Sequence, residues 1–233
     1  MLRKLTTAIL LATAATSFAQ EEIFDNPDNR AGFGVRLSYE LACPGDVKTT
    51  GGLLKIPMFG NSSGFSAGAV YNVPVWKNFY FEPGASIYYN TFSVNRDIYY
   101  PDANSASVRQ WGLRIPLNFG YRFDFTPDIA VSIFTGPEFN LSFKGNVHMS
   151  VDKYNVTSPA FGSEGMLNRS DIKWRIGAAV TLLDHYYIAV SGALGLCDNM
   201  RDDVVAAGEA GLPIEVPLKM HSNLFSITLG YNF

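Results

Sequence analysis

Ten charged residues stand at alternate positions of otherwise apolar or small-residue segments, and they are the first candidates for chemistry. Lining a pore, they could form an ion path or a proton relay. We favour a ladder of salt bridges that fills a narrow interior, because an unpaired buried charge costs several kcal/mol. The ten are Arg36, Glu40, Glu82, Arg114, Arg122, Glu138, Lys144, Asp171, Lys173 and Arg175, and all but Lys144 and Asp171 are assigned to the structural charge network.

Two neighbouring pairs of serine and histidine could supply a nucleophile and its base for lipid deacylation. His221 precedes Ser222, and His148 lies close to Ser150. A catalytic serine also needs an acid that orients the histidine, and no acid is fixed by the spacing. A lipid-modifying enzyme is therefore the alternative, and a protein without catalytic activity is preferred. The chain has no CxxC or HExxH motif, so no metal or other cofactor is expected.

The segments that carry the charged residues alternate in the manner of β-strands. In "WGLRIPLNFGYRF" (111–123), large apolar residues fill every second position, and the positions between hold two arginines, two glycines, Pro116 and Asn118. Phe134 is an exception in the polar phase of its segment. Eight segments of about ten residues show this alternation. They are 32–41, 64–75, 79–90, 111–123, 129–144, 171–182, 186–196 and 223–233.

The connections between these segments alternate between long and short. The short ones lie at 75–78, 124–128 and 183–185, and the long ones include 42–63, 145–170 and 198–221. This order predicts a single domain, an up-and-down meander with long loops on one rim.

The face assignment decides the fold class. Bulky residues from every strand would overfill the interior of an eight-stranded barrel, whereas the small and charged phase suits it. The sequence therefore predicts an all-β, eight-stranded antiparallel up-and-down transmembrane β-barrel with its apolar face in lipid, and strands of about ten residues cross the hydrocarbon. A soluble lipocalin-like carrier would need the opposite assignment. Aromatic girdles are expected at the strand ends, from Trp76, Phe79, Tyr121, Phe123, Phe125, Tyr186 and Tyr187.

The first 19 residues read as a secretory signal peptide, with a basic start at Arg3 and Lys4, the apolar stretch "LTTAILLATAAT" and cleavage after Ala19. The barrel domain would then be 20–233. A disulfide is permitted in an exported protein. Cys43 and Cys197 are predicted to lie at one rim and to form a disulfide, which requires the loops to lean together because two strand spacings exceed the bridging limit.

Several segments carry a resemblance to a known family. They are "RIPLNFGYRF" (114–123), "TGPEF" (135–139), "IKWRIGAAV" (172–180) and the terminal "SITLGYNF". Together they resemble the outer-membrane β-barrel domain of Bacteroidetes, the PorT-like or "porin family" barrels. That family's fourth strand begins with Glu where this chain has Arg114, a change that does not disturb the fold.

The resemblance implies a place in the cell envelope of a Gram-negative bacterium, in the outer membrane. It also implies insertion by the barrel-assembly machinery, with Phe233 as the C-terminal assembly signal. The namesake of the family is associated with protein export, so an accessory barrel of a secretion system is a further alternative. The motifs are architectural and do not assign an activity.

The expected function is that of a monomeric barrel without an open pore, with a structural role or a role in adhesion or partner binding. The long loops, among them "DIYYPDANSAS" and "VDKYNVTSPAFGSEG", would face the exterior. The expected partners are outer-membrane lipids, the barrel-assembly machinery and an extracellular or secretion-system protein. A net charge of −3 without a basic run gives no reason to expect nucleic acid.

Overall fold

The computed structural model describes residues 31–49, 55–57, 59–95, 105–151, 154–162, 165–201, 205–206 and 216–233. The predicted signal peptide, 1–19, lies outside these residues. Among the residues described, no helix has the length and apolar character needed to span a membrane.

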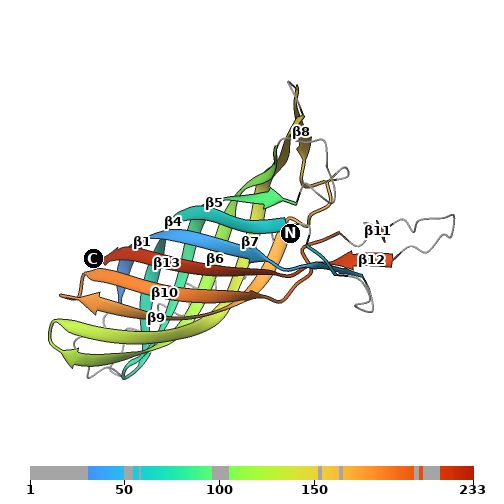
Figure 1. Ribbon diagram of the computed structural model, residues 1–233. Coiled ribbons are helices and arrows are strands. Elements are labelled where there is room, and N and C mark those ends of the chain that lie inside the picture. The colour runs from blue at the N-terminus through green and yellow to red at the C-terminus, as the bar shows by residue number, and fades with distance from the viewer. Residues whose placement is uncertain are drawn as a thin grey trace, which may run out of the picture.

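Eight long strands form a closed barrel (Figure 1). Each pairs antiparallel with its neighbour along the barrel, and the last strand pairs with the first, from Gly34 opposite Asn232 to Pro44 opposite Ser222. The fold prediction is therefore confirmed. The strands are β1 (Gly32–Pro44), β4 (Phe59–Trp76), β5 (Phe79–Val94), β6 (Ser105–Thr126), β7 (Ile129–Val151), β9 (Ser170–Leu182), β10 (Tyr186–Gly195) and β13 (Ser222–Asn232).

The apolar phase of each strand points outward, as predicted. On β6, Phe119 is 54% exposed while Arg114 is 3% exposed. Because the sheet closes on itself, every barrel strand is paired on both sides. The apolar exterior can therefore lie in lipid without leaving backbone N–H and C=O groups unpaired there. A soluble carrier with the opposite arrangement is inconsistent with these exposures.

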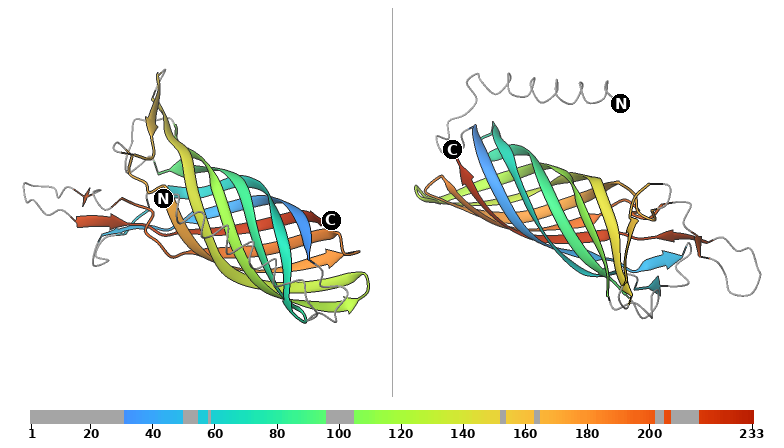
Figure 2. Two further views of the ribbon diagram at one scale, coloured as in Figure 1. Left: turned by 180° about the vertical axis from the view of Figure 1, so that it is seen from behind. Right: turned by 90° about the horizontal axis from the view of Figure 1, so that it is seen from above.

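Four strands are much longer than the expected length of about ten residues. β4 has 18 residues, β5 has 16, β6 has 22 and β7 has 23. The additional residues lie at the end of the barrel that carries the long loops, where Ser105 pairs with Ser150. Figure 2 shows these strands continuing past the rim of the barrel.

Where the strands pass this rim, the outward-facing residues become polar and the inward-facing residues become apolar. Outward-facing Phe65, Tyr89 and Trp111 form a row across β4, β5 and β6. The next outward row is polar and consists of Ser63, Thr91, Arg109 and Asn146. Beyond it the inward side chains become apolar, as in a soluble sheet. The row of aromatic residues therefore marks one edge of the apolar band.

A second aromatic group marks the other edge, near the short turns. Phe79 packs against Trp76 and Tyr121, with ring centroids 6.0 and 4.8 Å away. Along β6 the two edges are Trp111 and Tyr121, a separation that matches the 9–11 residues of a membrane-crossing strand. Tyr187 was expected in this group and the prediction is wrong, because its side chain points into the barrel and is buried.

Short strands complete the structure beyond the rim. β8 (Tyr154–Pro159) pairs with the end of β7 and forms a projecting hairpin (Figure 1). A separate small sheet contains, in this order, β11 (Val205–Ala206), β12 (Val216–Lys219), β2 (Val47–Thr49) and β3 (Lys55–Ile56).

Candidate functional site: the lumen and its cap

Aromatic rings folded over glycines narrow the half of the lumen next to the short turns. One rung of the barrel runs Tyr80, Gly120, Phe134, Gly177 across β5, β6, β7 and β9. A Cβ built on Gly120 would overlap the Tyr80 ring, and one built on Gly177 would overlap the Phe134 ring. The bulky exception at Phe134 thus fills the space that these glycines leave.

The first ionic layer lies beside this rung. Arg36 on β1 donates to the Glu82 carboxylate on β5 at 2.9 Å. The guanidinium of Arg36 also lies over the Tyr187 ring, with its Cζ 3.9 Å from the ring centroid. Sequence reasoning identified both charges but missed Tyr187, whose inward phase on β10 was the available indication.

A second ionic layer crosses the middle of the barrel. Arg114 forms ion pairs with Glu40 on β1 and with Glu138 on β7, the latter at 3.1 Å. The Arg175 Nε donates to Glu138 at 2.6 Å. Both glutamates are fully buried, so the arginines supply the compensation that a buried carboxylate requires.

Neutral side chains complete the hydrogen bonding of this layer. The Ser66 hydroxyl donates to Glu40 at 2.6 Å, and Asn140 joins the layer by accepting from Arg114 Nε at 2.8 Å. These two residues are charge-network partners that the sequence prediction did not include.

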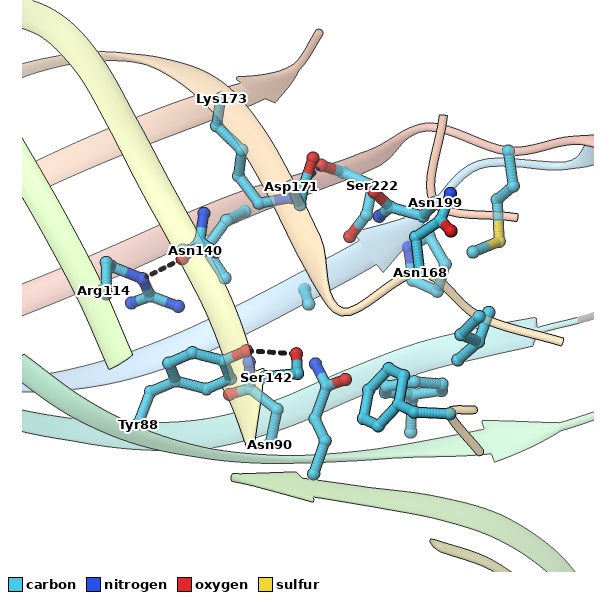
Figure 3. A pocket seen from close by; sticks show the side chains of 18 residues that line it. Tyr88, Asn90, Arg114, Asn140, Ser142, Asn168, Asp171, Lys173, Asn199 and Ser222 are labelled. Atoms are coloured by element: carbon cyan, nitrogen blue, oxygen red, sulfur yellow. Dashed lines mark hydrogen bonds and ion pairs between the residues drawn. The ribbon is translucent and has the colours of Figure 1, made fainter. Parts of the chain in front are cut away.

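A third layer lies toward the long loops (Figure 3). Lys173 pairs with Asp171 at 2.7 Å and donates to the Ser222 carbonyl. Beside it the Tyr88 hydroxyl and the Ser142 hydroxyl share a hydrogen bond of 2.7 Å.

Two charged residues behave differently from the others. Arg122 pairs with Asp124 and Asp184 at the short-turn end, at 2.6 and 2.8 Å, and lies apart from the central layers. Lys144 was expected to face inward, and it is exposed instead. A register shift places Trp111 opposite Lys144 but Gly112 opposite Ser142, and this bulge turns the lysine outward.

The layers divide the lumen into three cavities of about 70, 50 and 280 Å³. Arg114 borders the first two, while Arg36, Glu82 and Tyr187 border the last two. Side chains that form ion pairs therefore stand between successive cavities. The Asn118 amide oxygen is buried in the middle cavity and has no hydrogen-bond partner among the residues that the structure describes, so this polar space suits ordered water.

Beyond the third layer, an apolar cap covers the long-loop end of the lumen. Phe161, Leu167, Met200 and Met220 are buried in one cluster with inward side chains of the extended strands. Backbone hydrogen bonds tie the cap segments together, among them Asn168 N to Asn199 O and Asn199 N to Met220 O, both 2.9 Å. The sequence of these segments predicts plain connections between strands, without a buried apolar cluster.

The serine and histidine pairs do not form catalytic dyads in the described residues. The His221 Nδ1 lies 3.0 Å from the Cys197 carbonyl, and the His148 Nδ1 lies 3.1 Å from the Thr157 hydroxyl. No hydrogen bond in this part of the chain joins either histidine to its neighbouring serine.

In the structure Cys43 and Cys197 are free thiols. Cys43 lies on β1 opposite Asn223 of β13, and Cys197 follows β10 on the far side of β13. Two strand spacings lie between these backbone positions, so a disulfide stays a prediction that requires the loops to lean together.

Comparison with solved structures finds barrels of similar arrangement but low identity. OprG of Pseudomonas aeruginosa is 14% identical, with a TM-score of 0.44, over 88% of this chain and 97% of that one. Ail, the attachment invasion locus protein of Yersinia pestis, is 10% identical, with a TM-score of 0.42, over 88% and 99%. Neisserial surface protein A is 11% identical, with a TM-score of 0.40, over 87% and 97%.

A comparison with curated proteins gave no match. A family model described as "Outer membrane protein beta-barrel domain" matches residues 18–200, which include seven of the eight barrel strands. With its closed sheet, apolar exterior and ion-paired lumen, the chain belongs to the outer membrane protein beta-barrel domain family.

Proposed function

We propose that this protein is a closed barrel of the outer membrane that binds a protein partner outside the cell through the β7–β8 hairpin. Barrels of this membrane carry short turns on the periplasmic side and longer loops on the extracellular side. This rule supports a periplasmic place for the turn at Lys77 and an extracellular one for the cap. Residues 1–19 fit export as a signal peptide.

The lumen supports binding rather than transport. Three ionic layers and the apolar cap lie along the axis of the lumen. The first and second layers stand between neighbouring cavities. Barrels of eight strands have interiors that side chains can fill, whereas porins with wide channels have about twice as many strands.

The observation that carries the proposal is the outer edge of β8. β8 pairs with β7, and in the described part of the chain no strand pairs with its other edge. Tyr154 is 77% exposed and Val156 is 46% exposed on this hairpin. An exposed, uncharged strand edge offers unpaired backbone groups to another chain, so the partner would be an extended segment that adds as a strand.

A second candidate is an accessory role in protein secretion. The likeness of "RIPLNFGYRF" to the PorT-like barrels of Bacteroidetes supports it, and such a role also requires a surface for another protein. In either case Phe233, 73% exposed after the last strand, would be the residue presented to the barrel-assembly machinery.

Site-specific photo-crosslinking in living cells tests the proposal. A crosslinker at Asn155 on β8 is expected to give a discrete adduct, while one at Lys77 on the opposite end gives none of that size. Val156→Lys places a charge on the free edge and should abolish the adduct. His148→Lys adds the same charge to the inner strand of the hairpin and should preserve it.

Heat-modifiable migration on gels verifies that each variant contains a folded barrel. An adduct that is unchanged in Val156→Lys would contradict strand addition at β8, as would the absence of an adduct in the wild type.

A further inference from the structure

A hollow on the lipid-facing surface carries an inference independent of the extracellular hairpin. It has a volume of about 770 Å³ and lies on β4, β5, β6, β7 and β9 near the short turns. Its walls include Trp76, Phe79, Phe119, Ile133 and Ile176. This volume is in the range of ligand pockets.

The cause of the hollow is Thr135, the one small residue in the outward row where it crosses β5, β6, β7 and β9. Thr135 on β7 lies between Phe119 on β6 and Ile176 on β9. Below it the wall is thin, since Gly120 and Gly177 leave only the Tyr80 and Phe134 rings as the floor. The hollow is therefore built by the same glycine and aromatic rung that narrows the lumen.

The polar atoms at this place are already satisfied. The Trp174 indole donates to the Thr135 hydroxyl at 2.9 Å, and that hydroxyl donates to the Arg175 carbonyl at 2.9 Å. A ligand therefore gains nothing by offering hydrogen bonds here, and an apolar chain is the occupant that the lining fits.

One end of the hollow reaches the edge of the apolar band. Trp76 forms part of its wall, and the Lys77 ammonium lies 5.0 Å from the centroid of the Trp76 ring. A tryptophan beside a lysine at this depth is the pattern of a membrane interface. A molecule with an apolar chain in the hollow would place its head group near a cation.

We propose that the hollow is a binding site for one phospholipid of the leaflet at the short-turn end. An acyl chain lies over Thr135, and the phosphate lies near the Lys77 ammonium. This differs from general lipid contact because one lipid is held in a fixed place.

Native mass spectrometry of the full-length barrel in detergent tests this, with dipalmitoyl phosphatidylethanolamine as the probe and dipalmitoyl glycerol as the phosphate-free comparison. The wild type is expected to retain one phospholipid. Thr135→Phe fills the centre of the hollow, over its floor, and should weaken retention at least tenfold. Thr135→Val removes the hydroxyl without filling the space, and Ala67→Phe adds the same ring elsewhere on the exterior, so both should bind as the wild type does.

The head group is tested at Lys77, which has a φ of 50°. Lys77→Asn removes the charge while tolerating this backbone conformation. It should weaken phosphatidylethanolamine retention several-fold and leave dipalmitoyl glycerol retention unchanged. Lys48→Asn, at the long-loop end, is the matched control for charge.

Folding of each variant is checked by heat-modifiable migration, and Thr135→Leu replaces Thr135→Phe if the latter does not fold. Wild-type retention in the filled variants would overturn the proposal. A dimer that disappears in Thr135→Phe would also overturn it, because the hollow would then be an interface between two copies of the chain.

Discussion

Arg114 reaches across the lumen from β6 to form an ion pair with Glu40 on β1, and the two side chains are only 4% and 1% exposed. The same guanidinium holds Glu138 on β7, so one arginine links two carboxylates on strands that are not neighbours. This link ties opposite walls of the barrel together at the depth where the interior is most enclosed.

Arg114→Met should therefore destabilise the barrel strongly. It leaves two buried carboxylates short of a partner, and breaking a buried ion pair costs about 3–5 kcal/mol. Urea unfolding in lipid vesicles, followed by tryptophan fluorescence, measures the free energy of unfolding. Arg122→Met removes two ion pairs at the short-turn end, where the Arg122 and Asp184 side chains are 16% and 51% exposed, and should cost less than Arg114→Met. Equal losses in the two variants would contradict the central role of Arg114.

The lumen should conduct ions only when both the first layer, Arg36 with Glu82, and the second layer, around Arg114, are opened. In planar bilayers the wild type is expected to show no porin-like conductance steps, because paired side chains stand between its cavities. Arg36→Ala together with Arg114→Ala joins the three cavities, and small discrete steps are expected once Met200→Ala also loosens the apolar cap over the long-loop end. Arg122→Ala provides the control without conductance. Large steps in the wild type would show that the layers do not close the lumen.

The rung of glycines and rings gives a prediction about packing. Gly120→Ala forces a methyl group into the Tyr80 ring, and overpacking of this kind costs about 1–3 kcal/mol. Urea unfolding of Gly120→Ala with and without Tyr80→Ala should show partial relief in the double variant. Gly192→Ala is the matched control, because the nearest atom to its added Cβ is 4.0 Å away. A loss that Tyr80→Ala does not relieve would refute this contact.

The period of two predicted the barrel because it is a local property that does not depend on distant contacts. The order of long and short connections predicted the topology for a similar reason. The features that the sequence did not predict depend on the register between neighbouring strands. The bulge that turns Lys144 outward and the ring of Tyr187 under Arg36 require knowing which residues lie opposite each other on neighbouring strands.

The sequence does not predict the extended strands because their apolar residues change from the outward to the inward phase at the rim of the barrel. Phe92 and Val108 occupy the inward phase, which below the rim holds small and charged residues. A search for an apolar outward face therefore ends at Trp111 and reads the next residues as loop. The change itself is visible in the sequence, since Ser107 and Arg109 replace large residues in the outward phase. It would have located the edge of the membrane.

The cap above this edge should unfold separately from the barrel. Met200 is fully buried in the cap, and Met→Ala in a core costs about 2–5 kcal/mol. That cost falls on a small cluster outside the ionic layers, so Met200→Ala should make the long loops sensitive to trypsin while heat-modifiable migration of the barrel stays unchanged. Met166→Ala changes an exposed methionine and should leave the loops as resistant as in the wild type. If Met200→Ala also abolished the folded migration, the cap and the barrel would be one cooperative unit.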